Sequence, residues 1–176
     1  ENTIAEFEKG RAVFPNFTTY VHHYIEEWLP LLTKALHINN AELTEAREII
    51  EKGLSYFTET SWPYVHADIS QENLLGKLQN QTLLLTGLCD FENVQTGPPE
   101  YDLATIHDGI FLFYPHLEAP FLDGYTSLRP LPNQFQTRMR VVCLFRALRY
   151  IKRTVKYNET HYLEHDRQYF LHWLGA

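Results

Sequence analysis

The feature that most constrains this chain is a set of three polar residues between positions 66 and 92. Asp68 and Asn73 lie five positions apart, and Asp90 follows at the end of an apolar run. An aspartate, an asparagine and a second aspartate in this order are the minimum set of side chains for moving a phosphoryl group from a magnesium nucleotide to an alcohol. A kinase-type site is therefore the first hypothesis.

Each of the three side chains has a chemical task in such a site. Because phosphoryl transfer passes through a loose transition state, the protein mainly orients the acceptor hydroxyl, holds Mg²⁺ and stabilises charge. We assign Asp68 as the base that orients the hydroxyl. The amide oxygen of Asn73 and the carboxylate of Asp90 are hard oxygen ligands of the kind that suits Mg²⁺. Asn73 and Asp90 are therefore the predicted metal pair.

A β-hairpin is predicted between Asn73 and Asp90. Apolar residues at 74–75 and 83–85 flank the polar segment 77–81, which contains an asparagine and suits a turn. We expect this hairpin to bring Asn73 and Asp90 back to the same end.

At these residues the sequence resembles the aminoglycoside phosphotransferase and choline kinase family, whose members are distant relatives of protein kinases. The family pattern is approximately His-Gly-Asp-x-x-x-x-Asn, then an apolar strand ending in Asp-Phe-Gly, Asp-Trp-Glu or Asp-Phe-Glu, and then Tyr-Asp-Leu-Ala. The matching residues here are His66-Ala67-Asp68 with Asn73, Asp90-Phe91-Glu92, and Tyr101-Asp102-Leu103-Ala104. Three elements in the right order carry the resemblance.

The resemblance implies the same roles for the three polar residues as their chemistry does. Asp68 is implied to be the catalytic base, and Asn73 and Asp90 are implied to be magnesium ligands. The implied cofactors are Mg²⁺ and ATP, the latter as phosphoryl donor. The implied acceptor is a hydroxyl of a small molecule that is aminoglycoside-, choline- or sugar-like.

Supporting roles are implied for three further residues. Asp102 matches the buried carboxylate that braces the catalytic loop, 66–73, and His66 matches a structural residue packed beneath that loop. Glu92, in the metal-binding segment 88–92, either assists at the metal or at a cationic substrate, or is a surface cap.

The chain departs from the family pattern inside the loop. Ala67 replaces the usual glycine, and Gln71 and Glu72 stand where Pro-Gly is frequent. Alanine fits at position 67 only if the backbone there does not need a positive φ. None of these departures removes a catalytic group.

The implied fold class is mainly α with a small β-hairpin (α+β), and residues 1–176 would form the C-terminal lobe of a protein-kinase-like phosphotransferase. Kinases hold ATP between two lobes, and the smaller one supplies a strand-loop-strand cover and a lysine. The eight glycines here include no Gly-x-Gly pair, and nothing before residue 60 is typical of a β-hairpin sheet. Since the chain starts at Glu1 and its only methionine is Met139, we expect the N-terminal nucleotide-clamp lobe to lie upstream.

Helical periodicity places the remaining elements. The first predicted helix covers 16–37, and Pro30 is expected to kink or split it. A second helix is predicted from Asn40 to before Ser61, and three more over 101–113, 134–157 and 160–174. The segment 114–132 is predicted to be irregular.

Composition narrows the range of partners. A net charge of −7 argues against binding to a nucleic-acid backbone and favours a small-molecule alcohol that is cationic or neutral. No apolar stretch reaches the length needed to span a membrane, so no membrane partner is expected. Cys89 and Cys143 lack paired spacing, which fits a reducing compartment, and we expect the protein in the cytoplasm.

Two classes of function remain open from the sequence. The first is an ATP- and Mg²⁺-dependent phosphotransferase lobe that acts on a small-molecule alcohol. The second is a catalytically silent, kinase-like binding or regulatory module of a larger multidomain protein. Retention of Asp68, Asn73 and Asp90 favours the first class. We expect residues 1–176 alone to show negligible kinase activity, because half of the nucleotide clamp is missing.

Overall fold

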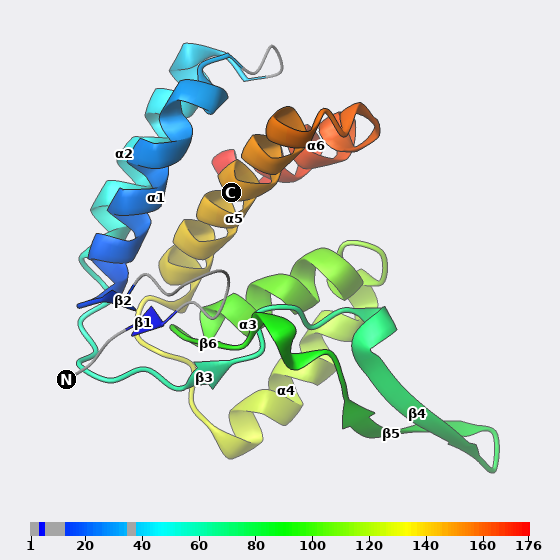
Figure 1. The fold of residues 1–176 in the computed structure, drawn as a ribbon. Helices are drawn as coiled ribbons and strands as arrows, with labels where there is room; N and C mark the ends of the chain where they lie inside the picture. The colour runs from blue at the N-terminus through cyan, green and yellow to red at the C-terminus, as the bar shows by residue number, and fades with distance from the viewer. Residues whose placement is uncertain (1–3, 6–12, 35–37) are drawn as a thin grey trace. The chain divides into compact units, whose positions relative to one another are not determined.

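A computed structural model describes residues 4–5, 13–34 and 38–176 as a mainly helical chain with short antiparallel strand pairs. This content agrees with the predicted α+β class. The chain divides into two compact units (Figure 1). The first unit contains Phe14–Thr60 and Asn133–Ala176, and the second contains Ser61–Pro132. None of the described helices is both long and apolar enough to cross a lipid bilayer.

The first unit is built from helices that pack against one central helix. Its helices are α1 (Phe17–Leu32), α2 (Asn40–Leu54), α5 (Phe135–Tyr157) and α6 (Leu163–Leu174), with a 3₁₀ turn, η5 (Thr160–Tyr162), before α6. Helix α5 contacts α1, α2 and α6, and every side chain from Val141 to Leu148 is buried. A helix that is buried all round belongs at the centre of a core. Trp28 of α1 stacks on Phe145 of α5 with ring centroids 5.0 Å apart.

Asparagine caps start the first two helices. The Asn16 side chain accepts a hydrogen bond from the Thr19 backbone N–H at 2.8 Å, which begins α1. Asn39 forms a capping box with Glu42 at the start of α2. Pro30 lies in the last turn of α1, and the helix ends soon after it, at Leu32. The predicted continuation through 35–37 lies outside the described residues.

The second unit contains the predicted hairpin. Its elements are β3 (Tyr64–Val65), η1 (Gln71–Asn73), β4 (Leu74–Gln79), β5 (Thr82–Leu88), η2 (Phe91–Asn93), β6 (Gln95–Thr96), α3 (Glu100–Ile106), the π-helical turn η3 (His107–Phe111), η4 (Pro115–Leu117) and α4 (Glu118–Leu128). Strands β4 and β5 pair antiparallel, so the predicted hairpin is confirmed. The two loop residues, Asn80 and Gln81, have φ of 50° and 63°, as a type I′ turn requires.

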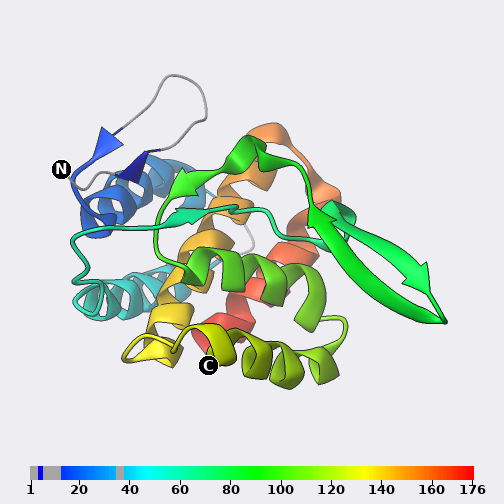
Figure 2. The same ribbon diagram turned by 90° about the horizontal axis from the view of Figure 1, so that it is seen from below.

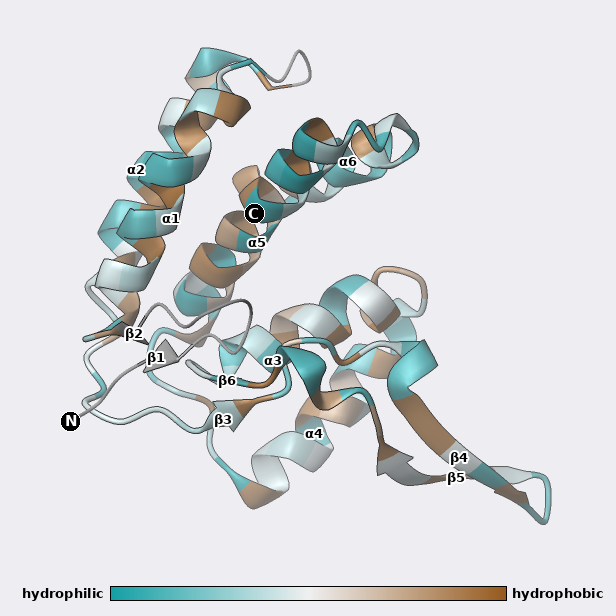
Figure 3. Cartoon of the chain, viewed as in Figure 1, coloured by the Kyte–Doolittle hydropathy of each residue, from teal (hydrophilic) through white to brown (hydrophobic). Residues whose placement is uncertain are grey.

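The hairpin is largely uncovered. Figures 1 and 2 show it extending beyond α3 and α4 of the same unit, and Figure 3 shows hydrophobic residues along both of its strands. Leu75, Leu78, Leu83, Leu84 and Leu85 are all exposed. Exposed apolar patches of this kind are typical of interaction surfaces.

Two predictions from the sequence are wrong. Residues 114–132 are not irregular, because α4 occupies most of this segment. Pro120 is accommodated in the first turn of α4, where a backbone N–H has no partner inside the helix in any case. The two-residue strands β1 (Ile4–Ala5) and β2 (Val13–Phe14) lie before residue 60, where no strand was predicted. Strands this short leave no alternating pattern to detect.

Substitution of Gly53 by alanine is expected to destabilise the protein. A Cβ at Gly53 in α2 would overlap Cγ2 of Val141 in α5. Overpacking costs about 1–3 kcal/mol, which exceeds the gain of about 1 kcal/mol from the better helix propensity of alanine. We expect Gly53→Ala to lower the free energy of unfolding by about 1 kcal/mol in chemical denaturation.

Gly124→Ala provides the matched control. Gly124 lies inside α4, and a Cβ there would meet nothing within 4 Å. This substitution should leave stability unchanged or raise it by up to about 1 kcal/mol. Equal effects of the two substitutions would contradict the packing of α2 on α5.

Candidate active site

Two strand pairings hold the loop 66–73 in place. Before the loop, β3 pairs with β6 through Tyr64↔Thr96 and Val65↔Gln95. After the loop, Leu74 of β4 pairs with Leu88 of β5. The Cys89 N–H continues this ladder by donating to the Asn73 carbonyl at 2.9 Å. The hairpin therefore returns the chain to the loop, as predicted.

The Asp102 carboxylate holds the start of the loop. Asp102 lies in the first turn of α3, and its two oxygens accept hydrogen bonds from the backbone N–H groups of His66 (3.1 Å) and Ala67 (2.8 Å). The side chain is half-buried. Hydrogen bonds to a charged acceptor are stronger than neutral ones, so this single residue fixes the backbone of two loop positions.

The backbone of Ala67 has a φ of 63°. The condition under which alanine fits at this position is therefore not met, because φ is positive. The left-handed conformation costs an L-residue other than glycine about 1–2 kcal/mol. The hydrogen bonds to Asp102 hold the loop in this conformation.

His66 joins the loop to the segment after β5. Its buried imidazole donates through Nε2 to the Cys89 carbonyl at 3.0 Å. The ring packs edge-on against Phe91, with centroids 4.6 Å apart. These contacts link segments 66–73 and 88–92 through one side chain.

The Asn73 side chain has a fixed orientation. Its Nδ2 donates to the backbone carbonyl of Asp68 at 2.8 Å. Because a carbonyl only accepts, the amide nitrogen must face Asp68, and the oxygen Oδ1 points to the other side. Asn73 is therefore oriented to offer an oxygen ligand.

Asp68, Asn73 and Asp90 line one cavity of about 510 Å³. Its other lining residues are Ser70, Gln71, Glu72 and Gly109. Oδ2 of Asp68 accepts a hydrogen bond from the Asn93 amide at 3.4 Å. Asp90 is exposed and has a φ of 64°, a conformation that aspartate tolerates better than most residues.

The charged residues that line this cavity, Asp68, Glu72 and Asp90, are all acidic, which favours a cation there. Within the described part of the chain, no group of three His, Cys, Asp or Glu side chains is arranged to hold a metal. A cation beside Asp90 and Asn73 would therefore be completed by oxygens from water and phosphate, as Mg²⁺ usually is. Glu92 is exposed and does not line the cavity, so its predicted assistance at the metal stays a prediction.

The sequence analysis missed supporting contacts of four residues: that of Asn93 with Asp68, and those of Thr105, Gln71 and Gly109. The Thr105 hydroxyl accepts a hydrogen bond from the Ile69 N–H (3.1 Å) and donates to the Asp102 carbonyl (2.8 Å). Gln71 donates through Nε2 to the Gly109 carbonyl in the π-helical turn η3 at 3.1 Å. The only available signal was the spacing of Thr105, three residues after Asp102 on the same helix. A π-helical turn leaves no signature in the sequence, although such turns are frequent at functional sites.

Gly109 of η3 lies against the loop. A Cβ at this position would lie 3.4 Å from Cα of Ser70, which is van der Waals contact. Nearby on α4, burial raises the pKa of Tyr125; Arg129 opposes the shift, whereas Glu100 and Asp102 add to it.

The phosphotransferase enzyme family matches residues 7–135, which include all three motifs. Since the match covers most of the chain, the protein belongs to this family, and the resemblance to aminoglycoside phosphotransferases and choline kinases is confirmed. No curated protein and no solved structure matches the chain.

Replacement of Ala67 by glycine is expected to stabilise the protein. Glycine adopts φ near 63° without the steric cost that alanine has, and this gain exceeds its larger loss of backbone entropy. We expect Ala67→Gly to raise the free energy of unfolding by about 0.5 kcal/mol, and Ala67→Val to lower it, in urea titrations. A stabilising Ala67→Val would show that the loop does not have this conformation.

Replacement of Asp102 by asparagine is expected to destabilise the loop. Asparagine offers one acceptor oxygen, so its NH₂ group would face one of the two backbone N–H donors. We expect Asp102→Asn to cost about 2 kcal/mol in thermal unfolding, whereas Asp123→Asn, at an exposed position on α4, should change stability by less than about 0.5 kcal/mol. Equal effects would rule out the bracing role of Asp102.

Proposed function

We propose that this chain is the catalytic C-terminal lobe of a kinase that transfers the γ-phosphoryl group of Mg·ATP to a hydroxyl of a small molecule. The observation that carries the proposal is that Asp68, Asn73 and Asp90 line a single cavity. The fixed orientation of the Asn73 amide supports it, because the free oxygen suits a magnesium ligand.

Each side chain has one part in the proposed reaction. Asp68 orients the acceptor hydroxyl and takes its proton. The hydroxyl oxygen then bonds to the γ-phosphorus while the bond from that phosphorus to the β–γ bridging oxygen breaks, and ADP leaves. Asn73 and Asp90 would hold Mg²⁺, which would supply positive charge beside the phosphates.

A second lobe of the same protein would complete the nucleotide site. The absence of a Gly-x-Gly pair from the sequence supports this part of the proposal, because such a loop commonly covers the phosphates in kinases. Activity is therefore best measured on the full-length protein that contains residues 1–176, with the isolated chain as a comparison of low expected activity.

Replacement of Asp68 or Asp90 is expected to abolish phosphoryl transfer. Loss of a general base lowers rates by about 10²–10⁴-fold, and loss of a metal ligand removes charge stabilisation from the same step. We expect Asp68→Asn and Asp90→Asn to lower kcat at least 100-fold for ADP formation with a panel of alcohols, and both to leave the folded structure intact by circular dichroism.

Asp123→Asn serves as the control, because Asp123 is an exposed aspartate outside the cavity. It should retain the parent rate. Turnover by Asp68→Asn at the parent rate would refute the assigned role. Magnesium-dependent nucleotide binding without turnover for any alcohol would instead identify a silent binding module.

A further inference from the structure

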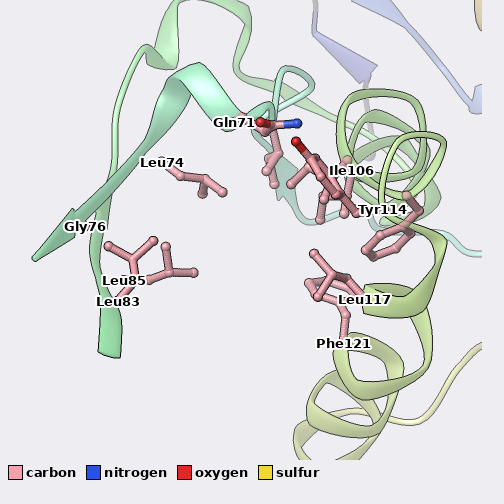
Figure 4. Close-up of a pocket in the computed structure, with 12 residues that line it drawn as sticks. Gln71, Leu74, Gly76, Leu83, Leu85, Ile106, Tyr114, Leu117 and Phe121 are labelled. Atoms are coloured by element: carbon pink, nitrogen blue, oxygen red, sulfur yellow. The ribbon is translucent and has the colours of Figure 1, made fainter. Parts of the chain in front are cut away.

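A second cavity, of about 620 Å³, lies in the same unit beside the acidic one. Its lining residues are Ile69, Gln71, Leu74, Gly76, Leu83, Leu85, Ile106, Ile110, Phe111, Tyr114, Leu117 and Phe121. Figure 4 shows leucines of the β4–β5 hairpin on one side of the space, with Ile106, Leu117 and Phe121 on the other. This volume is within the range of small-molecule sites.

The lining of this cavity is almost entirely apolar. No acidic or basic side chain is among its lining residues, and only Gln71 and Tyr114 bring side-chain polar atoms to it. Leu83 and Leu85 are 65% and 66% exposed, so they present apolar surface that a ligand would cover. An ammonium group placed here would lose water without gaining a carboxylate partner, and only the rings of Phe111, Tyr114 and Phe121 could offset that loss.

The two cavities adjoin through the catalytic loop. Gln71 lines both of them, and Ile69, which lines the apolar one, directly follows Asp68. The hydrogen bond from Gln71 to Gly109 fixes this side chain at the junction. A molecule with its body in the apolar cavity can therefore direct a hydroxyl towards the Asp68 side.

We propose that the apolar cavity binds the body of the acceptor, and that the acceptor is an uncharged alcohol with an apolar body. This inference rests on the proposed function and narrows its substrate class. It narrows the expectation of a cationic or neutral acceptor to a neutral one, because the negative charge lies around Asp68 and Asp90 and not along the cavity that would hold the body of the substrate.

Binding of two alcohols that differ only in charge tests the inference on residues 1–176. Choline and 3,3-dimethyl-1-butanol share one shape, with a quaternary nitrogen in the first and a carbon in the second. In ligand-observed NMR titrations without nucleotide, we expect the neutral alcohol to bind at least tenfold more tightly than choline. Each further methylene buried by a longer neutral alcohol should strengthen binding roughly fourfold. Tighter binding of choline, or no binding of any neutral alcohol, would overturn the inference.

Substitutions at two leucines of the hairpin test where the alcohol binds. Leu85 lines the cavity, whereas Leu78, with a similar exposure of 71% against 66%, does not. Leu85→Asp should weaken binding of the neutral alcohol at least fivefold, and Leu78→Asp should leave it unchanged. Equal effects of the two substitutions would overturn the inference. Displacement of the alcohol by adenosine would also overturn it, because the cavity would then be assigned to the nucleotide.

The binding test can contradict the apolar acceptor while the proposed function holds, and the reverse is also possible. Binding of a neutral alcohol requires no phosphoryl transfer, so it can occur even if Asp68→Asn has no effect on turnover. Conversely, a full-length protein that phosphorylates choline in preference to its neutral counterpart would retain the proposed function and overturn the apolar acceptor.

Discussion

The carboxylate of Asp102 accepts hydrogen bonds from the backbone N–H groups of His66 and Ala67, and the geometry of the site depends on this interaction. These bonds hold the loop in a turn that places Ala67 at a positive φ. Asp68 directly follows Ala67, and its backbone carbonyl accepts the hydrogen bond that fixes the side-chain amide of Asn73. One side chain on α3 thus determines, through the backbone, how two of the three polar residues are presented.

The third polar residue, Asp90, is placed by a different set of contacts. The β4–β5 ladder and the Cys89 N–H bond to the Asn73 carbonyl bring the chain back to the loop. The His66 imidazole adds a bond to the Cys89 carbonyl and a ring contact with Phe91. These contacts are backbone bonds or partly buried packing, which keep the cavity residues in position before any ligand binds. Preorganisation of this kind is what phosphoryl transfer needs from a protein.

Local sequence signals predicted much of the fold, and tertiary contacts account for what they missed. Asn80 between two apolar runs indicated the hairpin, and helical periodicity gave α2 and α5. Helix α4 was missed because Pro120 and many aromatic residues suggested a loop, although proline is compatible with a first turn. The hairpin predicted between Asn73 and Asp90 brings both into one cavity with Asp68, whereas the chemical roles of these residues stay predictions. The positive φ of Ala67 and the bond from Gln71 to Gly109 depend on α3 and η3 packing against the loop, which no local pattern encodes.

The central claim of the proposal is that Asn73 and Asp90 hold a single divalent cation beside Asp68, in the cavity that the three residues line. Mn²⁺ substitutes for Mg²⁺ at oxygen sites, and it broadens the NMR signals of nearby nuclei. Titration of ¹⁵N-labelled protein with Mn²⁺ and a non-hydrolysable ATP analogue tests the claim most directly. The account predicts that the Asn73 side-chain amide and the backbone amides around Asp90 lose intensity first. Broadening that begins instead at the exposed glutamates of α2 (Glu45, Glu48 and Glu51), with signals from the loop unchanged, would contradict it.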